Sequence, residues 1–295
     1  MKLDLRRRSS IGSAVFETAN TIFLLLIAFV TLYPMYYILI VSISGGTYIV
    51  RGMISFIPKG INVEAYRMVF KNDDIWRSYA NTLLYTSFGT LINIICTSMC
   101  AYPLSRADFY GRKILTFMIV LTMFISGGMI PLYLVINRLK MINTLWAIVI
   151  PPAINTYNMI IMRTFFNGIP VSLQESAYLD GANDIQILAK IILPLSKPIM
   201  ATMTLFYAVQ HWNSFFPALL YLNTKVKYPV QLILRDIVVA GEFSDQSGEI
   251  TQSLTIIATN YKYAVIIITV IPILLVYPFL QKYFAKGVMI GAVKG

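Results

Sequence analysis

The chain alternates between long apolar runs, which lack any acidic or basic side chain, and short charged connections. Six of these runs reach the roughly 20 residues that a helix needs to cross a bilayer core. One such run could be a buried core helix, but six in one chain fit a soluble protein poorly. The pattern predicts an all-α integral membrane protein with helices at 19–43, 80–104, 114–137, 145–167, 199–222 and 263–282.

Composition agrees with this prediction. Apolar residues make up 57% of the chain and charged residues only 13%, about half the usual charged share of a globular domain. The net charge of +11 does not indicate nucleic-acid binding, because the basic residues form no stripe with interleaved aromatic residues. They lie mostly at helix ends, where lysine and arginine extend toward lipid headgroups.

The predicted topology follows from the first helix. Arg6, Arg7 and Arg8 precede it and place the N-terminal segment 1–18 in the cytoplasm. The first apolar run is too long for a cleaved signal peptide and lacks a following cleavage site, so we interpret it as an anchor. Six crossings of the domain 19–282 then return the tail 283–295 to the cytoplasm.

Two hydrophilic segments, 44–78 and 223–259, fall outside the cell in this topology. The second contains AGEFSDQSGEITQS, which we interpret as a flexible polar loop with bends at Gly241 and Gly248. Proline and glycine also occur within the predicted helices, notably at 127–128, 131 and 151–152. Such residues are compatible either with ordinary packing of kinked helices or with broken helices that line a transport path.

Several kinds of chemistry find no support in the sequence. No glycine-rich loop ends in Lys-Ser/Thr, so the chain is not expected to hydrolyse ATP. The single histidine and the two cysteines, Cys96 and Cys100, form no metal-binding pattern. The six apolar runs contain no carboxylate, which disfavours a proton- or sodium-coupled carrier.

The segment 170–198, PVSLQESAYLDGANDIQILAKIILPLSKP, interrupts the apolar pattern. Ser172 and Glu175 have the spacing of a capping box, and Leu173, Ala177 and Tyr178 would form the apolar side of the helix that follows. Gly181 is expected to end this helix, and a second capping-box pattern starts another helix at Asn183. The sequence predicts two short helices on the cytoplasmic face. The alternative interpretation is a solvated loop that docks onto no partner.

This segment resembles the conserved cytoplasmic loop of importer permeases in the ATP-binding-cassette (ABC) family, whose pattern is E-A-A, D-G-A and I-x-L-P. Ser176 replaces the first alanine. Four other stretches, NTLLYTS, AYPLSRADFYGRK, HWNSFFPALLYL and YFAKGVMIGAVKG, are similar to the carbohydrate branch, including the smaller maltose-system permease and Gram-positive oligosaccharide permeases. The residues that the resemblance assigns to ATPase coupling are Glu175, Ala177, Tyr178, Asp180, Gly181, Ala182, Leu188 and Pro194.

The resemblance implies a subunit of the bacterial cytoplasmic membrane that works with a second permease, two ATP-binding subunits and an external solute-binding protein. ATP and Mg²⁺ would bind the partner ATPase, and this chain would bind no cofactor. Glu175 would pair with a basic residue of the ATPase, and Gly181 would allow close approach of the two backbones. The outer loop would contact the binding protein through Gln246 and Gln252.

Sugars are bound by aromatic faces and by side-chain amides, so polar and aromatic residues within the predicted helices are candidates for the sugar path. They are Asn155, Tyr157, Asn158, His211, Trp212 and Asn213. Hydrogen bonding between helices is the alternative role for these residues. The competing functions for the whole chain are a membrane-embedded glycosyl or lipid transferase and a secondary carrier or channel.

Overall fold

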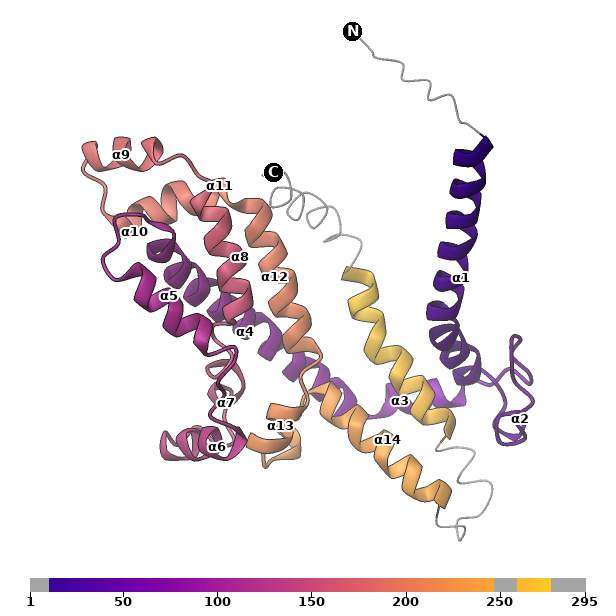
Figure 1. Ribbon diagram of the computed structural model, residues 1–295. Helices are drawn as coiled ribbons and strands as arrows, with labels where there is room; N and C mark the ends of the chain where they lie inside the picture. Colours follow the sequence, from indigo (N-terminus) through magenta and orange to yellow (C-terminus); the bar gives the residue numbers. More distant parts are fainter. Residues whose placement is uncertain (1–10, 247–258, 277–295) are drawn as a thin grey trace. The chain divides into compact units, whose positions relative to one another are not determined.

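The computed structural model describes residues 11–246 and 259–276, and these residues form helices and connecting turns without any strand (Figure 1). The helices are α1 (Ile11–Ser42), α2 (Gly46–Val50), α3 (Glu64–Lys71), α4 (Asp73–Ser105), α5 (Arg112–Leu121), α6 (Met129–Arg138), α7 (Trp146–Val149), α8 (Thr156–Asn167), α9 (Ser172–Leu179), α10 (Asp184–Ile187), α11 (Leu193–Leu195), α12 (Lys197–Trp212), α13 (Phe216–Tyr221) and α14 (Val230–Gln246). A π-helical turn occupies Leu188–Ile192, and a further helix covers Thr259–Val276. The all-α prediction is confirmed for these residues.

The chain divides into two compact units. The first contains α1, α2 and the start of the helix Thr259–Val276, and the second contains α4 to α13. In the first unit, Ile40, Val41 and Ile54 form a small core against Tyr263. The Asn260 side chain donates a hydrogen bond to the Ser44 carbonyl at 3.0 Å, which fastens the start of the last helix to the end of α1.

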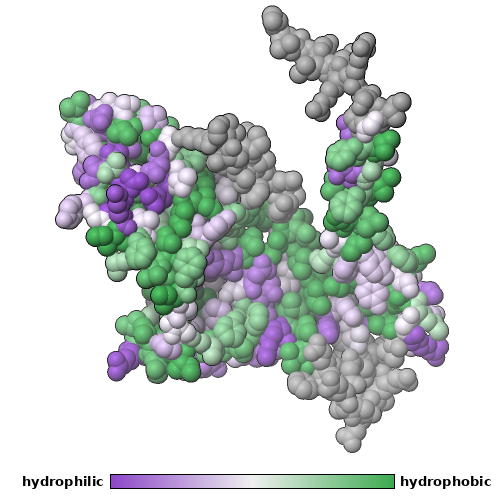
Figure 2. All heavy atoms as spheres, viewed as in Figure 1, coloured by the Kyte–Doolittle hydropathy of each residue, from purple (hydrophilic) through white to green (hydrophobic). Residues whose placement is uncertain are grey.

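Within residues 11–246 and 259–276, three helices are long and apolar enough to cross a membrane: Ala14–Ser42, Asp73–Ser105 and Thr259–Val276. A fourth candidate is the pair Asp184–Leu195 and Lys197–Trp212, which is bent by 88°. Hydrophobic residues cover much of the visible face of α1 (Figure 2); among them, Leu25 is 64% exposed and Phe23 is 61% exposed. Exposed apolar surface of this extent is expected of a helix whose solvent is lipid.

The predicted helices at 114–137, 145–167 and 199–222 are not continuous. The first divides into α5 and α6, the second into α7 and α8, and the third into α12 and α13. The breaks coincide with residues that end or begin helices: Gly128 precedes α6 with φ 83° and ψ 171°, and the Asn155 side chain caps α8. Hydropathy alone does not report these breaks, because the residues within them are as uncharged as the helices around them.

The two hydrophilic segments contain more helix than predicted. The helix α4 begins at Asp73, capped by the Asn72 side chain, inside the predicted loop 44–78. The helix α14 occupies much of the predicted loop 223–259, so the expected bend at Gly241 is wrong. Gly248 lies outside the described residues. Val230, Leu232 and Ile233 are buried on α14, and their helical spacing was the signal that the polar composition of the segment concealed.

The helix α4 is the centre of the second unit, where it packs against α8 and α12. Near its start it holds the backbone of residues 226–230. The Asn81 amide donates to the Val226 carbonyl at 2.7 Å, and the Tyr85 hydroxyl donates to the Lys227 carbonyl at 2.7 Å. The Val230 amide donates to the Thr82 hydroxyl at 2.8 Å. These three contacts give a structural role to the stretch NTLLYTS.

Candidate functional site

The segment 170–198 forms two short helices joined by a tight turn. At the end of α9 the Ala182 amide donates to the Ala177 carbonyl at 2.9 Å, and the Gly181 amide donates to the Tyr178 carbonyl at 3.0 Å. This is the Schellman arrangement, which requires a left-handed residue after the helix. Gly181 provides it with φ 80°. A Cβ at Gly181 would meet no atom of this chain within 4 Å, so backbone conformation rather than crowding within this chain selects glycine.

The next helix begins as the sequence predicted. The Asn183 side chain accepts from the Gln186 amide at 2.9 Å, and the Gln186 side chain accepts from the Asn183 amide at 3.0 Å. This reciprocal pair is a complete capping box. The D-G-A-N sequence is therefore a rigid joint, with a Schellman stop on one side and a capped start on the other.

The start of the first helix differs from the prediction. The residue before α9 is Val171, and no side chain caps its first amides. Ser172 is already helical, so the expected capping box between Ser172 and Glu175 is wrong. Ala177 and Gln174 are the buried residues of α9, whereas Leu173, expected on the apolar side, is 43% exposed. Pro170 starts the first turn by accepting from the Leu173 amide at 3.3 Å, which moves the helix start toward the N-terminus.

Beyond α10 the chain enters the core of the second unit. Ile187 and Ile192 are completely buried there, and Leu188 and Ile191 pack against the same cluster. The turn between them is π-helical, a rare geometry that is common at functional sites. Pro194 lies in the first turn of the short helix α11. These four side chains therefore join α9 and α10 to the helices α4, α8 and α12.

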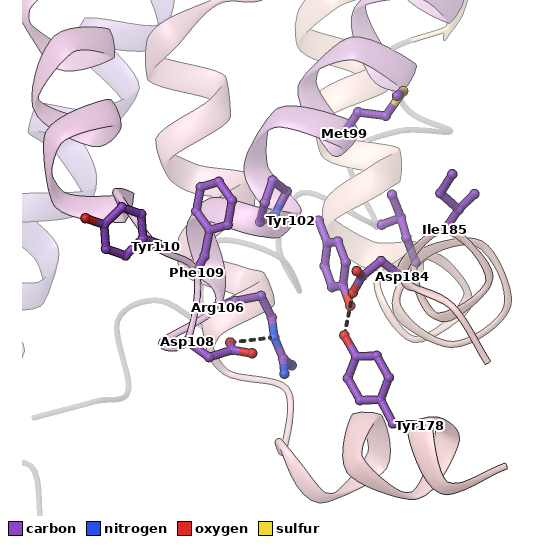
Figure 3. A pocket seen from close by; sticks show the side chains of 11 residues that line it. Met99, Tyr102, Arg106, Asp108, Phe109, Tyr110, Tyr178, Asp184 and Ile185 are labelled. Atoms are coloured by element: carbon purple, nitrogen blue, oxygen red, sulfur yellow. Dashed lines mark hydrogen bonds and ion pairs between the residues drawn. The ribbon is translucent and has the colours of Figure 1, made fainter. Parts of the chain in front are cut away.

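A hydrogen bond also links the two short helices. The Tyr178 hydroxyl on α9 donates to a carboxylate oxygen of Asp184 on α10 (Figure 3). This bond raises the pKa of Tyr178 above its ordinary range, because the carboxylate stabilises the protonated phenol. Both residues line a pocket of about 470 Å³ whose other wall is the end of α4 and the turn that follows it.

Basic side chains stabilise this turn. Arg163 of α8 donates from Nε to the Leu104 carbonyl at 2.8 Å, and Arg112 donates to the Arg106 carbonyl at 3.3 Å. Arg106 pairs with Asp108 at 3.4 Å (Figure 3). Cationic groups are favourable at a helix C-terminus, where carbonyl groups lack intrahelical partners. The stretch AYPLSRADFYGRK is thus the end of α4, its turn and the start of α5.

The residues expected to couple to an ATPase differ in exposure. Ala177 is buried. Three residues of the same segment that were not predicted to couple also differ: Ile187 is buried, whereas Leu179 and Ile185 are 90% and 75% exposed. Glu175, Tyr178, Asp180, Gly181 and Pro194 are exposed, and Ala182 and Leu188 are partly buried. Hydrophilic side chains gather over α9 and α10 in Figure 2. The two helices therefore present a mixed polar and apolar surface.

The residues expected along a sugar path fall into two groups. Asn158, His211 and Trp212 are 5%, 6% and 7% exposed. The His211 imidazole lies 2.6 Å from the Asn93 amide oxygen, so its hydrogen bond joins two helices. Asn93 also donates to the Pro152 carbonyl. Asn93 was not among the predicted residues, although it is one of two side-chain amides in the apolar run 78–105, with Asn81, and was a usable signal.

The second group is accessible. Tyr157 is 59% exposed, Asn213 is exposed and Asn155 is partly buried. The Asn155 side chain accepts from the Asn158 amide at 3.1 Å, and its backbone amide donates to the Tyr207 hydroxyl at 3.2 Å. The same hydroxyl lies 2.7 Å from that of Thr97 on α4. The structure brings the start of α8, α4 and α12 together through buried polar groups.

Two other expectations concern metal binding and the outer loop. Within residues 11–246 and 259–276, no three side chains of His, Cys, Asp or Glu group as a metal site requires. Gln246 is the last residue of α14. Gln252 lies outside the described residues.

Comparison with known proteins identifies the family. Residues 5–290 match the family described as "Binding-protein-dependent transport system inner membrane component". The chain is 43% identical to the polygalacturonan/rhamnogalacturonan transport system permease protein YtcP of Bacillus subtilis (strain 168), over 92% of this chain and 96% of that protein. It is 41% identical to Protein LplC of the same organism, over 95% of each.

A solved structure is similar over almost the whole chain. It is described as the crystal structure of a bacterial ABC transporter involved in the import of the acidic polysaccharide alginate, with a TM-score of 0.83 and 36% identity over 94% of this chain and 99% of the matched chain. The family that the motif Glu175–Pro194 suggested is confirmed. The chain therefore belongs to the family of inner membrane components of binding-protein-dependent transport systems.

Proposed function

We propose that this chain is the permease subunit of an ATP-driven importer for oligosaccharides that carry uronic acids. The observation that carries the substrate class is the similarity to a polygalacturonan/rhamnogalacturonan permease and to a transporter chain involved in alginate import. Polygalacturonan and alginate are both acidic polysaccharides. A second permease would complete the translocation path, and an external binding protein would deliver the sugar.

The proposed topology has six crossings with both termini in the cytoplasm. The helices α1, α4 and Thr259–Val276 span alone, while α5 with α6, α7 with α8, and α12 with α13 each form a broken span. Arg6, Arg7 and Arg8 support this orientation. Broken helices are typical of transporters, in which irregular backbone lines a cavity.

The helices α9 and α10 are proposed to dock onto the partner ATPase, which binds ATP and Mg²⁺. Their surface supports this, because Leu179 and Ile185 expose apolar side chains beside the acids Glu175 and Asp180. Exposed apolar groups within a polar surface mark sites of protein association. Movement of the ATPase would pass through the rigid joint at Gly181 and the buried residues Ile187 and Ile192 into the bundle.

At the opposite end of the topology, α14 and the residues after it are proposed to contact the binding protein. Gln246 at the end of α14 and Gln252 beyond it are the candidate contacts. Val230 and Leu232 are buried and fix the first turn of α14 in the core. This supports a helix held in position for a partner rather than a flexible connecting loop.

The experiment that tests the function is reconstitution of the complete importer in liposomes. Uptake of a labelled oligogalacturonate is expected to require this chain, the second permease, the ATPase, ATP and the binding protein together. Uptake by this chain alone would indicate a carrier. Purification of this chain as a stable protein that brings neither an ATPase nor a second permease with it would contradict the proposal.

A further inference from the structure

Two helix breaks meet inside the second unit. The Thr122 hydroxyl, just after α5, lies 3.2 Å from the Thr156 hydroxyl, in the first turn of α8. The Thr122 hydroxyl also donates to the Ile119 carbonyl at 2.6 Å. Its only proton is therefore engaged, so Thr156 donates to Thr122, and both oxygens keep free acceptor positions.

The lengths of the two helices place this contact near the middle of a bilayer. The turn before α5 is charged and belongs at a membrane surface, and the ten residues of α5 rise about 15 Å from it. The twelve residues of α8 rise about 18 Å from its end near α9. Half of the hydrocarbon core is about 15 Å, so both breaks lie close to the midplane.

The backbone between α5 and α6 is open. The carbonyl groups of residues 123–126 accept no hydrogen bond from the described part of the chain. A Cβ at Gly127 would meet no atom within 4 Å, and one at Gly128 would meet only Pro131, at 3.9 Å. Unpaired backbone groups are not tolerated against lipid and occur at membrane depth only beside protein or a water-filled cavity.

The chemistry of the exposed groups restricts the ligand. The break offers several carbonyl acceptors together with the hydroxyls of Thr122 and Thr156. Next to Thr156, the Tyr157 ring is 59% exposed. A sugar ring carries hydroxyl donors on its edges and an apolar C–H face, which match acceptors and an aromatic ring. Carbonyl oxygens repel a carboxylate, so an acidic sugar would present its hydroxyl edge here.

We propose that the break at 122–128 and the first turn of α8 form a subsite of the translocation path that binds the hydroxyl edge of a sugar ring. Thr122, Thr156 and the carbonyl groups of residues 123–126 are its hydrogen-bonding groups, and Tyr157 is its aromatic face. This inference rests on the proposed function. It replaces the buried His211 and Asn158 by accessible groups.

The test uses the complete importer with Cys96 and Cys100 replaced by serine and one cysteine introduced by Thr156→Cys. A membrane-impermeant methanethiosulfonate is expected to label this cysteine, and an oligogalacturonate is expected to slow the labelling several-fold. A matched Leu24→Cys variant, on the apolar surface of α1, is expected to stay unlabelled. Absence of labelling at Thr156→Cys would show that lipid or the second permease covers the break, and would overturn the subsite.

A transport assay separates the two proposals. Thr156→Val is expected to raise the KM for uptake roughly fivefold, the effect of one lost hydrogen bond. Thr156→Ser keeps the hydroxyl and is expected to have a KM close to that of the native importer. If the importer carries oligogalacturonate but the sugar does not protect Thr156→Cys, the subsite is wrong and the proposed function stands. If the importer with native residues carries no sugar, the proposed function is wrong, and the subsite that rests on it is wrong as well.

Discussion

Gly89 on α4 lies directly against the His211 ring on α12. A Cβ built on Gly89 would overlap the imidazole, with Cε1 at 2.5 Å and Cδ2 at 2.8 Å. The ring has little freedom to move, because His211 is 6% exposed and its Nε2 is hydrogen-bonded to Asn93 at 2.6 Å. Glycine at position 89 thus sets the spacing at which the two helices bond.

Gly89→Ala is expected to destabilise the protein. Overpacking of a well-filled core typically costs about 1–3 kcal/mol, which exceeds the gain of about 1 kcal/mol that alanine brings to a helix. Thermal unfolding of the purified protein in detergent measures the change. Gly127→Ala is the control, because a Cβ there meets open space. Equal stability of the two variants would contradict the close packing of Gly89 and His211.

A second prediction compares two threonines one turn apart on α4. The buried Thr82 hydroxyl accepts from the Val230 amide at 2.8 Å and donates to the Ser78 carbonyl at 2.9 Å. Thr82→Val leaves that amide unpaired, which is expected to cost about 1–3 kcal/mol of unfolding free energy. The buried Thr86 hydroxyl has no partner in the described chain, so Thr86→Val is expected to be neutral or stabilising.

Denaturation of the two valine variants in parallel gives a direct comparison, because side-chain shape and helix position are closely matched. Thr82→Ser, which keeps the hydroxyl, is expected to retain most of the stability. A Thr86→Val variant as unstable as Thr82→Val would show that valine itself, rather than the bond to Val230, causes the loss.

Gly128 provides a third prediction. Its φ of 83° and ψ of 171° lie in a region that is essentially restricted to glycine and costs other residues about 1–3 kcal/mol. Gly128→Ala is therefore expected to distort the start of α6 and to reduce uptake. Gly127→Ala differs by one position and has no such strain, so it is expected to lose less uptake than Gly128→Ala. Similar uptake rates for both variants would argue against a fixed break.

The sequence predicted those features that depend on neighbouring residues. The apolar runs predicted an all-helical membrane protein, the pattern from Glu175 to Pro194 predicted the family, and the Asn183–Gln186 spacing predicted a capping box that the structure contains. Each of these signals lies within a few residues and needs no knowledge of the fold.

The features that the sequence did not predict depend on distant residues. His211 appears in the sequence as a polar candidate for the path, but its partner Asn93 is 118 residues away, and only the fold shows that the pair is buried. Hydropathy cannot distinguish a continuous helix at 114–137 from two helices with an open turn. The predicted capping box at Ser172 is wrong because a turn already begins at Pro170, which makes Ser172 the first helical residue.

The last prediction concerns Gly181, whose φ of 80° completes the Schellman end of α9. A β-branched residue in this conformation is strained by roughly 1–2 kcal/mol, whereas asparagine is the other residue that commonly occupies it. Gly181→Val is expected to misplace α10 relative to α9, so that ATP hydrolysis no longer drives uptake although the protein still reaches the membrane. Gly181→Asn is expected to keep most of the uptake. The measurement is binding-protein-stimulated ATP hydrolysis alongside uptake in liposomes. If both variants lose uptake equally, the available space rather than the backbone angle selects glycine, as direct contact with the ATPase would require. If neither loses uptake, the joint between α9 and α10 does not transmit the movement.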